Sequence, residues 1–289
     1  MQGFASVDGK KRPILWAFEK PRGNVFSTQP ANLAVENGFY PDDVETYLAD
    51  VIENPSNRIL EHIRDLHRFE EADKVEFSRY ITAMIRRVPR HRERLYNEVL
   101  PDALGKTFES WRELIQSEHS AGHLSGDTLA LRMRELDELE RRWKLEPPDE
   151  LKPENTPPNV SPEVVELLSS MHWTFVTSEG PSFFLTSDNP VFFTEGRGMG
   201  KPDSELSFPL STHVALWIKR IPVASDCAFC RAKQFLVREM NKRTIVCATR
   251  FLYYHEHAQW IPRLITHPHP KLQQLPDGDT GVFKDRPRS

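Results

Sequence analysis

The sequence has few of the features that mark secreted and membrane proteins. It has only three cysteines, an odd number without the spacing of a disulfide framework, and this usage is typical of a reducing cytoplasm. No apolar run approaches the roughly 20 residues that a membrane helix needs. The apolar stretch from Ile14 to Phe18 follows three basic residues but is too short for a secretory signal. We therefore expect a cytoplasmic protein without a membrane segment.

Several common catalytic motifs are also absent. The sequence contains no Walker loop, no glycine-rich dinucleotide fingerprint, no nucleophile elbow and no HExxH zinc motif. These absences argue against the common nucleotide-dependent enzymes and the zinc proteases. The net charge of −4 gives no whole-protein electrostatic reason to bind nucleic acid, so such binding would need a local basic patch.

The residues that are present predict a globular chain with a sizeable core. Of its 289 residues 38% are hydrophobic, including 17 Phe and 6 Trp. A hairpin is predicted over residues 14–28, and Asn54 before Pro55 is a helix start signal. Apolar periodicity predicts helices near 43–53, 55–71, 74–98, 105–121, 126–144 and 229–242, with a short helix after Pro162. Strands are predicted near 173–177, 183–186, 191–194, 206–210, 214–218 and 244–250.

A proline-rich stretch divides the predicted elements into two groups. Six prolines lie between positions 146 and 162, where neither helix nor sheet can continue. We predict an α+β fold in which a helical lobe packs on a mainly antiparallel sheet lobe. The predicted parts are an N-terminal hairpin of the sheet lobe (1–41), a helical lobe (42–145), a proline-rich strap (146–162), the sheet lobe (163–267) and a flexible tail (268–289).

A polar stretch between two aromatic strands is the first candidate site. Thr186, Ser187, Asp188 and Asn189 precede Pro190, which forces Asn189 into an extended conformation. A carboxylate at a strand end can bind a metal ion or act as a general base. The alternative is an Asx-turn, in which Asp188 bonds backbone groups and closes a hairpin.

An arginine cluster between Ile85 and Arg94 is the second candidate. On a continuous helix, Arg86 and Arg90 lie opposite the apolar stripe, whereas Arg92 falls on the buried side unless Pro89 kinks the helix. Arginine forks match phosphate oxygens, so this cluster is a possible phosphate or nucleic-acid clamp. The alternative is a solvated face with salt bridges to neighbouring glutamates.

Cys227 and Cys230 have the spacing of half a zinc site. Cys247, His255 and His257 follow, but neither a second CxxC nor an HxxxH comes after Cys230 in the sequence. Cys247 lies in an apolar segment that we interpret as a core strand. Ordinary burial of these cysteines is therefore favoured over a zinc site.

The chain resembles an uncharacterised bacterial family catalogued as domain of unknown function 4238. The resemblance covers nearly the whole chain apart from the tail, and Ser-Asp-Asn-Pro is its most specific part. Members open with a His-Tyr-Val-Pro-like segment, which this chain lacks; if that histidine belongs to the site, we expect this chain to be inactive. The matching residues are Gly3-Phe4-Ala5, Leu15-Trp16-Ala17-Phe18, Gly38-Phe39-Tyr40, Ile52-Glu53, Arg87-Val88-Pro89-Arg90, Trp173, Thr186-Ser187-Asp188-Asn189-Pro190, Phe208-Pro209-Leu210-Ser211 and Asn241.

Two functional hypotheses follow, with a site expected between the lobes. The first is a phosphate-handling hydrolase, such as a nuclease-like toxin or defence effector, that uses a divalent metal ion such as magnesium. Its metal or base carboxylates would be Asp188 and Glu53, assisted by Asn189 and Ser187, and its substrate-binding residues would be Arg87, Arg90, Arg86 and Asn241. The second is a non-catalytic module that binds a protein or nucleic acid, with Ser-Asp-Asn-Pro as a structural turn.

Overall fold

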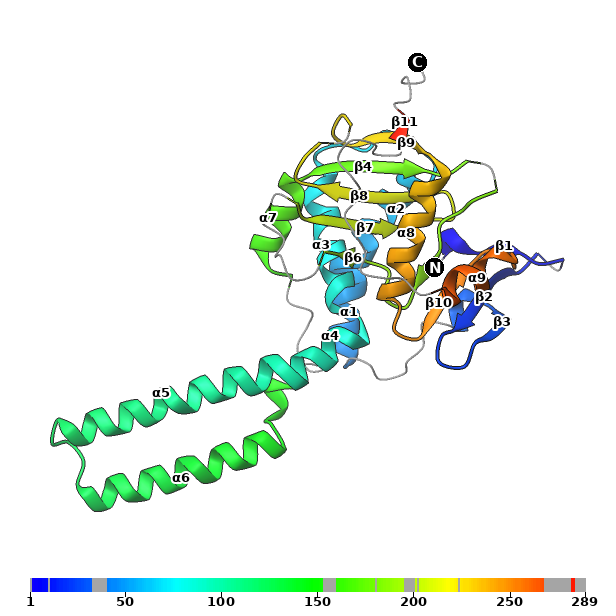
Figure 1. Ribbon diagram of the computed structural model, residues 1–289. Coiled ribbons are helices and arrows are strands. Elements are labelled where there is room, and N and C mark those ends of the chain that lie inside the picture. The colour runs from blue at the N-terminus through cyan, green and yellow to red at the C-terminus, as the bar shows by residue number, and fades with distance from the viewer. Residues whose placement is uncertain are drawn as a thin grey trace. The chain divides into compact units, whose positions relative to one another are not determined.

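The computed structural model describes residues 2–9, 11–32, 41–152, 160–179, 181–194, 201, 203–222, 224–267 and 282–283 (Figure 1). The predicted tail, part of the proline-rich strap and the family-like segment 38–40 therefore lie largely outside the described residues. The chain forms two compact units. The first comprises Met1–Asn37, Leu48–Val88 and Val160–Ser289, and the second comprises Gly38–Tyr47 and Pro89–Asn159.

The fold is α+β with two mainly antiparallel sheets, as the sequence predicted. The larger sheet has the order β11 (Val282–Phe283), β9 (Ala228–Ala232), β4 (His172–Thr177), β8 (Val214–Lys219), β7 (Glu205–Pro209) and β6 (Phe192–Phe193). In this sheet β9 runs parallel to β4 and the other neighbours are antiparallel. The smaller sheet contains β1 (Ser6–Val7), β2 (Pro13–Glu19), β3 (Asn24–Thr28), β10 (Phe251–Tyr254) and β5 (Thr186–Ser187). The β2–β3 pair confirms the predicted N-terminal hairpin.

Helices cover both faces of the larger sheet. Figure 1 shows α8 (Gln234–Cys247) across one face, while α2 (Asn54–Arg64), α3 (Asp73–Arg86) and α7 (Pro162–Ser170) belong to the other. Alternate residues of β8 divide between the two layers: Leu216 packs with α2 and α3, and Trp217 packs with α8. Because both of its faces are buried, β8 is an almost continuous apolar run in the sequence.

The second unit is built around a helical hairpin. It contains α1 (Asp42–Tyr47), α4 (Pro89–Arg94), α5 (Leu100–Ser120) and α6 (Gly126–Leu145), and α5 and α6 lie side by side. A small apolar core formed by Leu104, Phe108 and Leu136 joins the two long helices. The Ser125 side chain accepts a hydrogen bond from the Thr128 backbone N–H, and this contact caps the start of α6.

The predicted helix over 74–98 is interrupted at its middle. α3 ends at Arg86, residues 87–88 are not helical, and α4 begins at Pro89. Proline is tolerated at the first helical position because that N–H has no partner within the helix. Pro89 is also the first residue of a segment of the second unit.

α2 begins at Asn54, where the sequence predicts a helix start, but the predicted cap at Asn54 is wrong. A π-helical segment, Leu48–Glu53, joins α1 to α2 without a break, and Glu53 has helical backbone angles. The Asn54 side-chain amide donates to Asp50 Oδ1 at 3.4 Å rather than capping a new helix. A capping residue before proline was therefore a misleading signal here.

The predicted helix over 229–242 is confirmed over 234–242 but displaced, and the predicted strand over 244–250 is wrong. Residues 228–232 form β9, which pairs with β4, and α8 then extends to Cys247. The segment that we interpreted as a core strand is thus the last turn of α8. Similarly, the predicted strand over 183–186 is limited to Thr186 and Ser187. Within the described part of the chain, no helix is long and apolar enough to cross a membrane.

Candidate functional site

The carboxylate of Asp188 binds three backbone N–H groups of a distant segment. Its Oδ1 accepts from Thr249 N at 2.9 Å, and its Oδ2 accepts from Arg250 N at 2.7 Å and Phe251 N at 3.0 Å. In return, the Asp188 backbone N–H donates to the Phe251 carbonyl. These contacts fix the point at which the chain leaves α8 and enters β10.

Ser187 and Asn189 complete the same arrangement. The buried Asn189 side-chain amide donates to the Cys247 carbonyl at 3.1 Å, and Ser187 Oγ accepts from Asn189 N at 3.1 Å. Cys247 is the last residue of α8, where backbone carbonyls lack partners within the helix. We call Ser187, Asp188 and Asn189 the backbone clamp, because all three side chains bind backbone groups.

The predicted substrate-binding residue Asn241 also binds backbone. It lies in α8 and is only 1% exposed. Its Oδ1 accepts from Leu185 N at 2.9 Å, and its Nδ2 donates to the Phe183 carbonyl at 2.8 Å. Asn241 therefore holds the segment that leads into the backbone clamp, and both ends of its amide are engaged.

Arg250 extends these contacts to β2. Its Nε and Nη2 atoms donate to Glu19 Oε1 at 3.1 and 2.8 Å, and its guanidinium stacks on the Phe251 ring. The hydrogen bond from Arg250 lowers the pKa of Glu19, so this carboxylate stays ionised. The clamp, α8, β10 and β2 thus form one connected set of polar contacts.

Glu53 and the arginine cluster form local ion pairs. Glu53 pairs with Arg87, and among the described residues no hydrogen bond or ion pair joins Glu53 to Asp188. Arg86 is half-buried, and this burial lowers the pKa of its guanidinium. The side chain of Arg90 lies outside the described residues. Further ion pairs join Arg79 to Glu76 and Arg94 to Glu98.

The donor groups around these residues do not fit a metal ion well. Nowhere in the described ranges do three or more His, Cys, Asp or Glu side chains gather closely enough to hold one. Asp188 would have to release backbone N–H groups before it could bind magnesium. Burial raises the pKa of Cys227 to about 12, which keeps it a thiol rather than a nucleophilic thiolate at neutral pH.

A buried charge cluster lies between α8 and the larger sheet, and the sequence reasoning missed it. Its members are Glu205 of β7, Lys219 of β8 and Arg243 of α8. Glu205 Oε2 accepts from Arg243 Nη2 at 2.7 Å and from Trp217 Nε1 at 3.3 Å, and its Oε1 lies 3.3 Å from Lys219 Nζ. In the sequence, this cluster is indicated by two charged residues at strand ends: Glu205 is the first residue of β7, and Lys219 is the last residue of β8.

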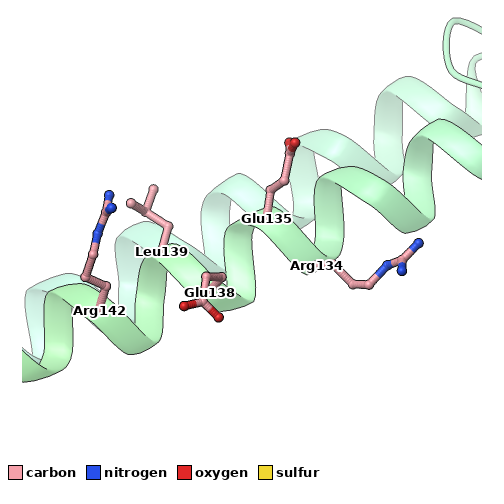
Figure 2. A pocket seen from close by; sticks show the side chains of 5 residues that line it. All are labelled: Arg134, Glu135, Glu138, Leu139 and Arg142. Carbon is pink, nitrogen blue, oxygen red and sulfur yellow. The ribbon is translucent and has the colours of Figure 1, made fainter.

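A surface groove on α6 has few characteristics of a binding site. It has a volume of about 390 Å³, and its five lining residues all come from one helix. Figure 2 shows their side chains spread along that helix rather than converging on one point. Four of the five are charged, and Glu135 and Glu138 lie next to arginines of the same helix. We assign no function to this groove.

Two of the segments that carry the family resemblance, Gly3-Phe4-Ala5 and Phe208-Pro209-Leu210-Ser211, lie close together at Gly3. The Gly3 carbonyl accepts from Thr212 N at 3.0 Å and from Thr212 Oγ1 at 3.2 Å. A Cβ atom at Gly3 would lie 2.8 Å from Arg64 Nε and 2.9 Å from the Leu210 carbonyl oxygen. Only glycine allows the N-terminal segment to pass this close to the turn before β8.

A model of the family described as "Protein of unknown function (DUF4238)" matches residues 2–258. The chain belongs to this family. The Gly3 contact, the backbone clamp and the buried charge cluster all lie within the matched span of the DUF4238 model. The comparisons found no matching curated protein and no matching solved structure.

Replacing Gly3 with alanine should destabilise this DUF4238 protein. The added methyl group forces Arg64 or the Leu210 carbonyl to move, and overpacking of this kind costs about 1 to 3 kcal/mol. Thermal unfolding followed by circular dichroism measures the effect. Gly9→Ala is the matched control because a Cβ there meets nothing within 4 Å. Equal melting temperatures for the two variants would show that the Gly3 contact is not tight.

Proposed function

We propose that this protein is a non-catalytic recognition module that binds a partner protein, and that the backbone clamp is a structural element. The observation that supports this most is the engagement of Asp188 with three backbone N–H groups. A general base or metal ligand needs a lone pair directed at its substrate or ion. Using Asp188 in that way would take the acceptor from the N–H donors at the start of β10, and the partly buried N–H of Phe251 would then lack one at a cost of about 1 to 3 kcal/mol. A cytoplasmic location is part of this proposal.

A phosphate-handling hydrolase, such as a nuclease-like toxin or defence effector, is the competing proposal. One observation favours it: Arg86 is half-buried, and no ion pair neutralises it among the described residues. Such a guanidinium can hold a phosphate group. The proposed catalytic carboxylates support the hydrolase less well. Glu53 is already paired with Arg87, and Asp188 is bound to backbone groups.

One pair of measurements on Asp188→Asn separates the two proposals. The asparagine has the same shape but places one amide N–H against backbone donors, so we expect a lower melting temperature. We also expect no hydrolysis of bis(p-nitrophenyl) phosphate by the wild-type protein with Mg²⁺ or Mn²⁺. Metal-dependent hydrolysis by the wild-type protein that disappears in Asp188→Asn, at an unchanged melting temperature, would overturn the recognition proposal.

A further inference from the structure

β3 forms an open edge of the smaller sheet. It pairs with β2, and the opposite side of β2 is occupied by β1 and β10. No other strand in the described ranges pairs with β3, and residues 24–27 are exposed to solvent. The outer side of β3 is therefore accessible along most of the strand.

The register shows which backbone groups point outward from this edge. Lys20 N donates to the Arg250 carbonyl at 2.8 Å, so even-numbered residues of β2 direct their backbone groups towards β10. Odd-numbered residues of β2 then face β3, where Ala17 is opposite Phe26 and Glu19 is opposite Asn24. The N–H and C=O groups of Val25 and Ser27 consequently point away from β2, where an additional strand would lie.

This edge lacks the features that usually protect an exposed strand. Natural edge strands carry lysine, proline or a bulge that prevents pairing with another chain. β3 has the sequence Asn-Val-Phe-Ser-Thr, without charge or proline, and it pairs with β2 residue for residue. Val25 is 37% exposed and Phe26 is 38% exposed, and the two side chains lie on opposite faces of the sheet. An added strand would cover both.

A polar groove continues from the end of β3. It has a volume of about 320 Å³, and its lining includes Ser27, Thr28, Gln29 and Asn32. Its two charged residues, Asp8 and Arg12, neutralise each other through an ion pair at 3.0 Å. The groove thus offers hydroxyl and amide groups without net charge.

We propose that β3 binds an extended, uncharged segment of a partner protein as an added antiparallel or parallel strand. This inference rests on the proposed recognition function and names the chemistry of its partner. Backbone bonds to Val25 and Ser27 supply affinity, and a polar side chain of the segment enters the groove beyond Thr28. A charged segment fits less well, because neither the strand nor the groove offers net opposite charge.

A second copy of this chain is a less suitable occupant. Pairing of β3 with β3 of another molecule would join two strands of five residues. Stable dimers bury about 1,200 Å² or more, which far exceeds the contact of two such short edges. A flexible segment can instead follow both the edge and the groove.

Peptide selection on the full chain tests this inference. Random peptides displayed on phage are selected on the wild-type protein, and the enriched peptides are synthesised for binding by fluorescence polarisation. Ser27→Pro removes the serine hydroxyl and an outward N–H, and it leaves the hydrogen bonds between β2 and β3 intact. Ser27→Ala removes the hydroxyl but keeps the N–H. We expect the Kd of Ser27→Pro to be about tenfold or more above that of Ser27→Ala, a loss of about 1.4 kcal/mol, because only the proline variant lacks the N–H. Val25→Lys, which places a charge on the edge, should weaken binding similarly and serves if Ser27→Pro unfolds.

Each contrary outcome has a distinct meaning. Peptides that bind the wild type, Ser27→Pro and Val25→Lys equally would overturn the assignment of β3 and leave the recognition function standing. A failure to enrich any peptide would count against both proposals. Concentration-dependent dimerisation that is seen by sedimentation and lost in Ser27→Pro would show that the occupant is a second copy, and would also overturn the inference.

Discussion

Replacing Asp188 with alanine should lower the free energy of unfolding by about 2 to 4 kcal/mol, because three backbone N–H groups lose a charged acceptor, and water can replace it only at the exposed Thr249 and Arg250. The affected groups belong to Thr249, Arg250 and Phe251. The link between α8 and β10 would loosen, while the apolar core remains intact. Urea unfolding followed by tryptophan fluorescence measures the loss.

The matched control for this prediction is Asp102→Ala. Asp102 pairs with Lys106 one helical turn away at 2.8 Å, and both side chains are largely exposed. An exposed pair of this kind is worth roughly 1 kcal/mol or less. If Asp188→Ala and Asp102→Ala destabilise the protein equally, the Asp188 carboxylate is not an anchor for the backbone.

Glu205→Gln should be similarly destabilising, by about 3 to 5 kcal/mol. Glu205 is 2% exposed and bridges Arg243 and Lys219. Glutamine keeps the shape but removes the negative charge, so two cations remain buried beside a neutral amide. The loss of one partner leaves uncompensated buried charge, which is much more costly than the loss of a surface pair. Urea unfolding again provides the measurement.

Arg243→Met is the comparison that tests this reasoning. Glu205 would keep Lys219 and the indole N–H of Trp217, so its charge would remain partly compensated. Arg243 Nη1 is buried without a hydrogen-bond partner among the described residues, so methionine also removes an unsatisfied donor. We therefore expect a smaller loss than for Glu205→Gln. If Arg243→Met lowers the free energy of unfolding more than Glu205→Gln does, then Arg243, not Glu205, determines the stability of the buried charge cluster.

The sequence predicted the parts of the fold that depend on local pattern. The hairpin over 14–28 has two strands around a turn that contains Pro21 and Gly23, β8 is an almost continuous apolar run, and β4 and β7 place apolar residues at alternate positions. The α+β class follows from the change of apolar period along the chain. These features can be predicted without knowing which segments of the chain are in contact in the folded protein.

The errors arose where tertiary contacts decide the structure. Residues 228–232 have no strong preference for a strand, and they form β9 because β4 offers a free edge beside them. The apolar residues Leu236, Val237, Met240 and Ile245 suit a helix on the sheet, although their polar neighbours obscure the pattern. Short apolar runs are ambiguous between helix and strand on sequence alone.

The role of the backbone clamp could not be predicted for a related reason. The sequence shows the side-chain donors and acceptors of residues 187–189, but the backbone groups that Asp188 and Asn189 bind lie about sixty residues away, at 247–251. Every residue carries backbone N–H and C=O groups, so the sequence holds no signal of which ones will be bound. A polar strand end that serves catalysis and one that holds backbone therefore have the same appearance in a sequence.

Amide hydrogen exchange at Thr249, Arg250 and Phe251 tests the central claim most directly. If Asp188 holds these N–H groups, they should be strongly protected in the wild-type protein and lose protection in Asp188→Ala, while amides of β8 stay protected in both. Rapid exchange of all three amides in the wild-type protein, at the rate of exposed loops, would contradict the structural role of the clamp and return Asp188 to the candidates for catalysis.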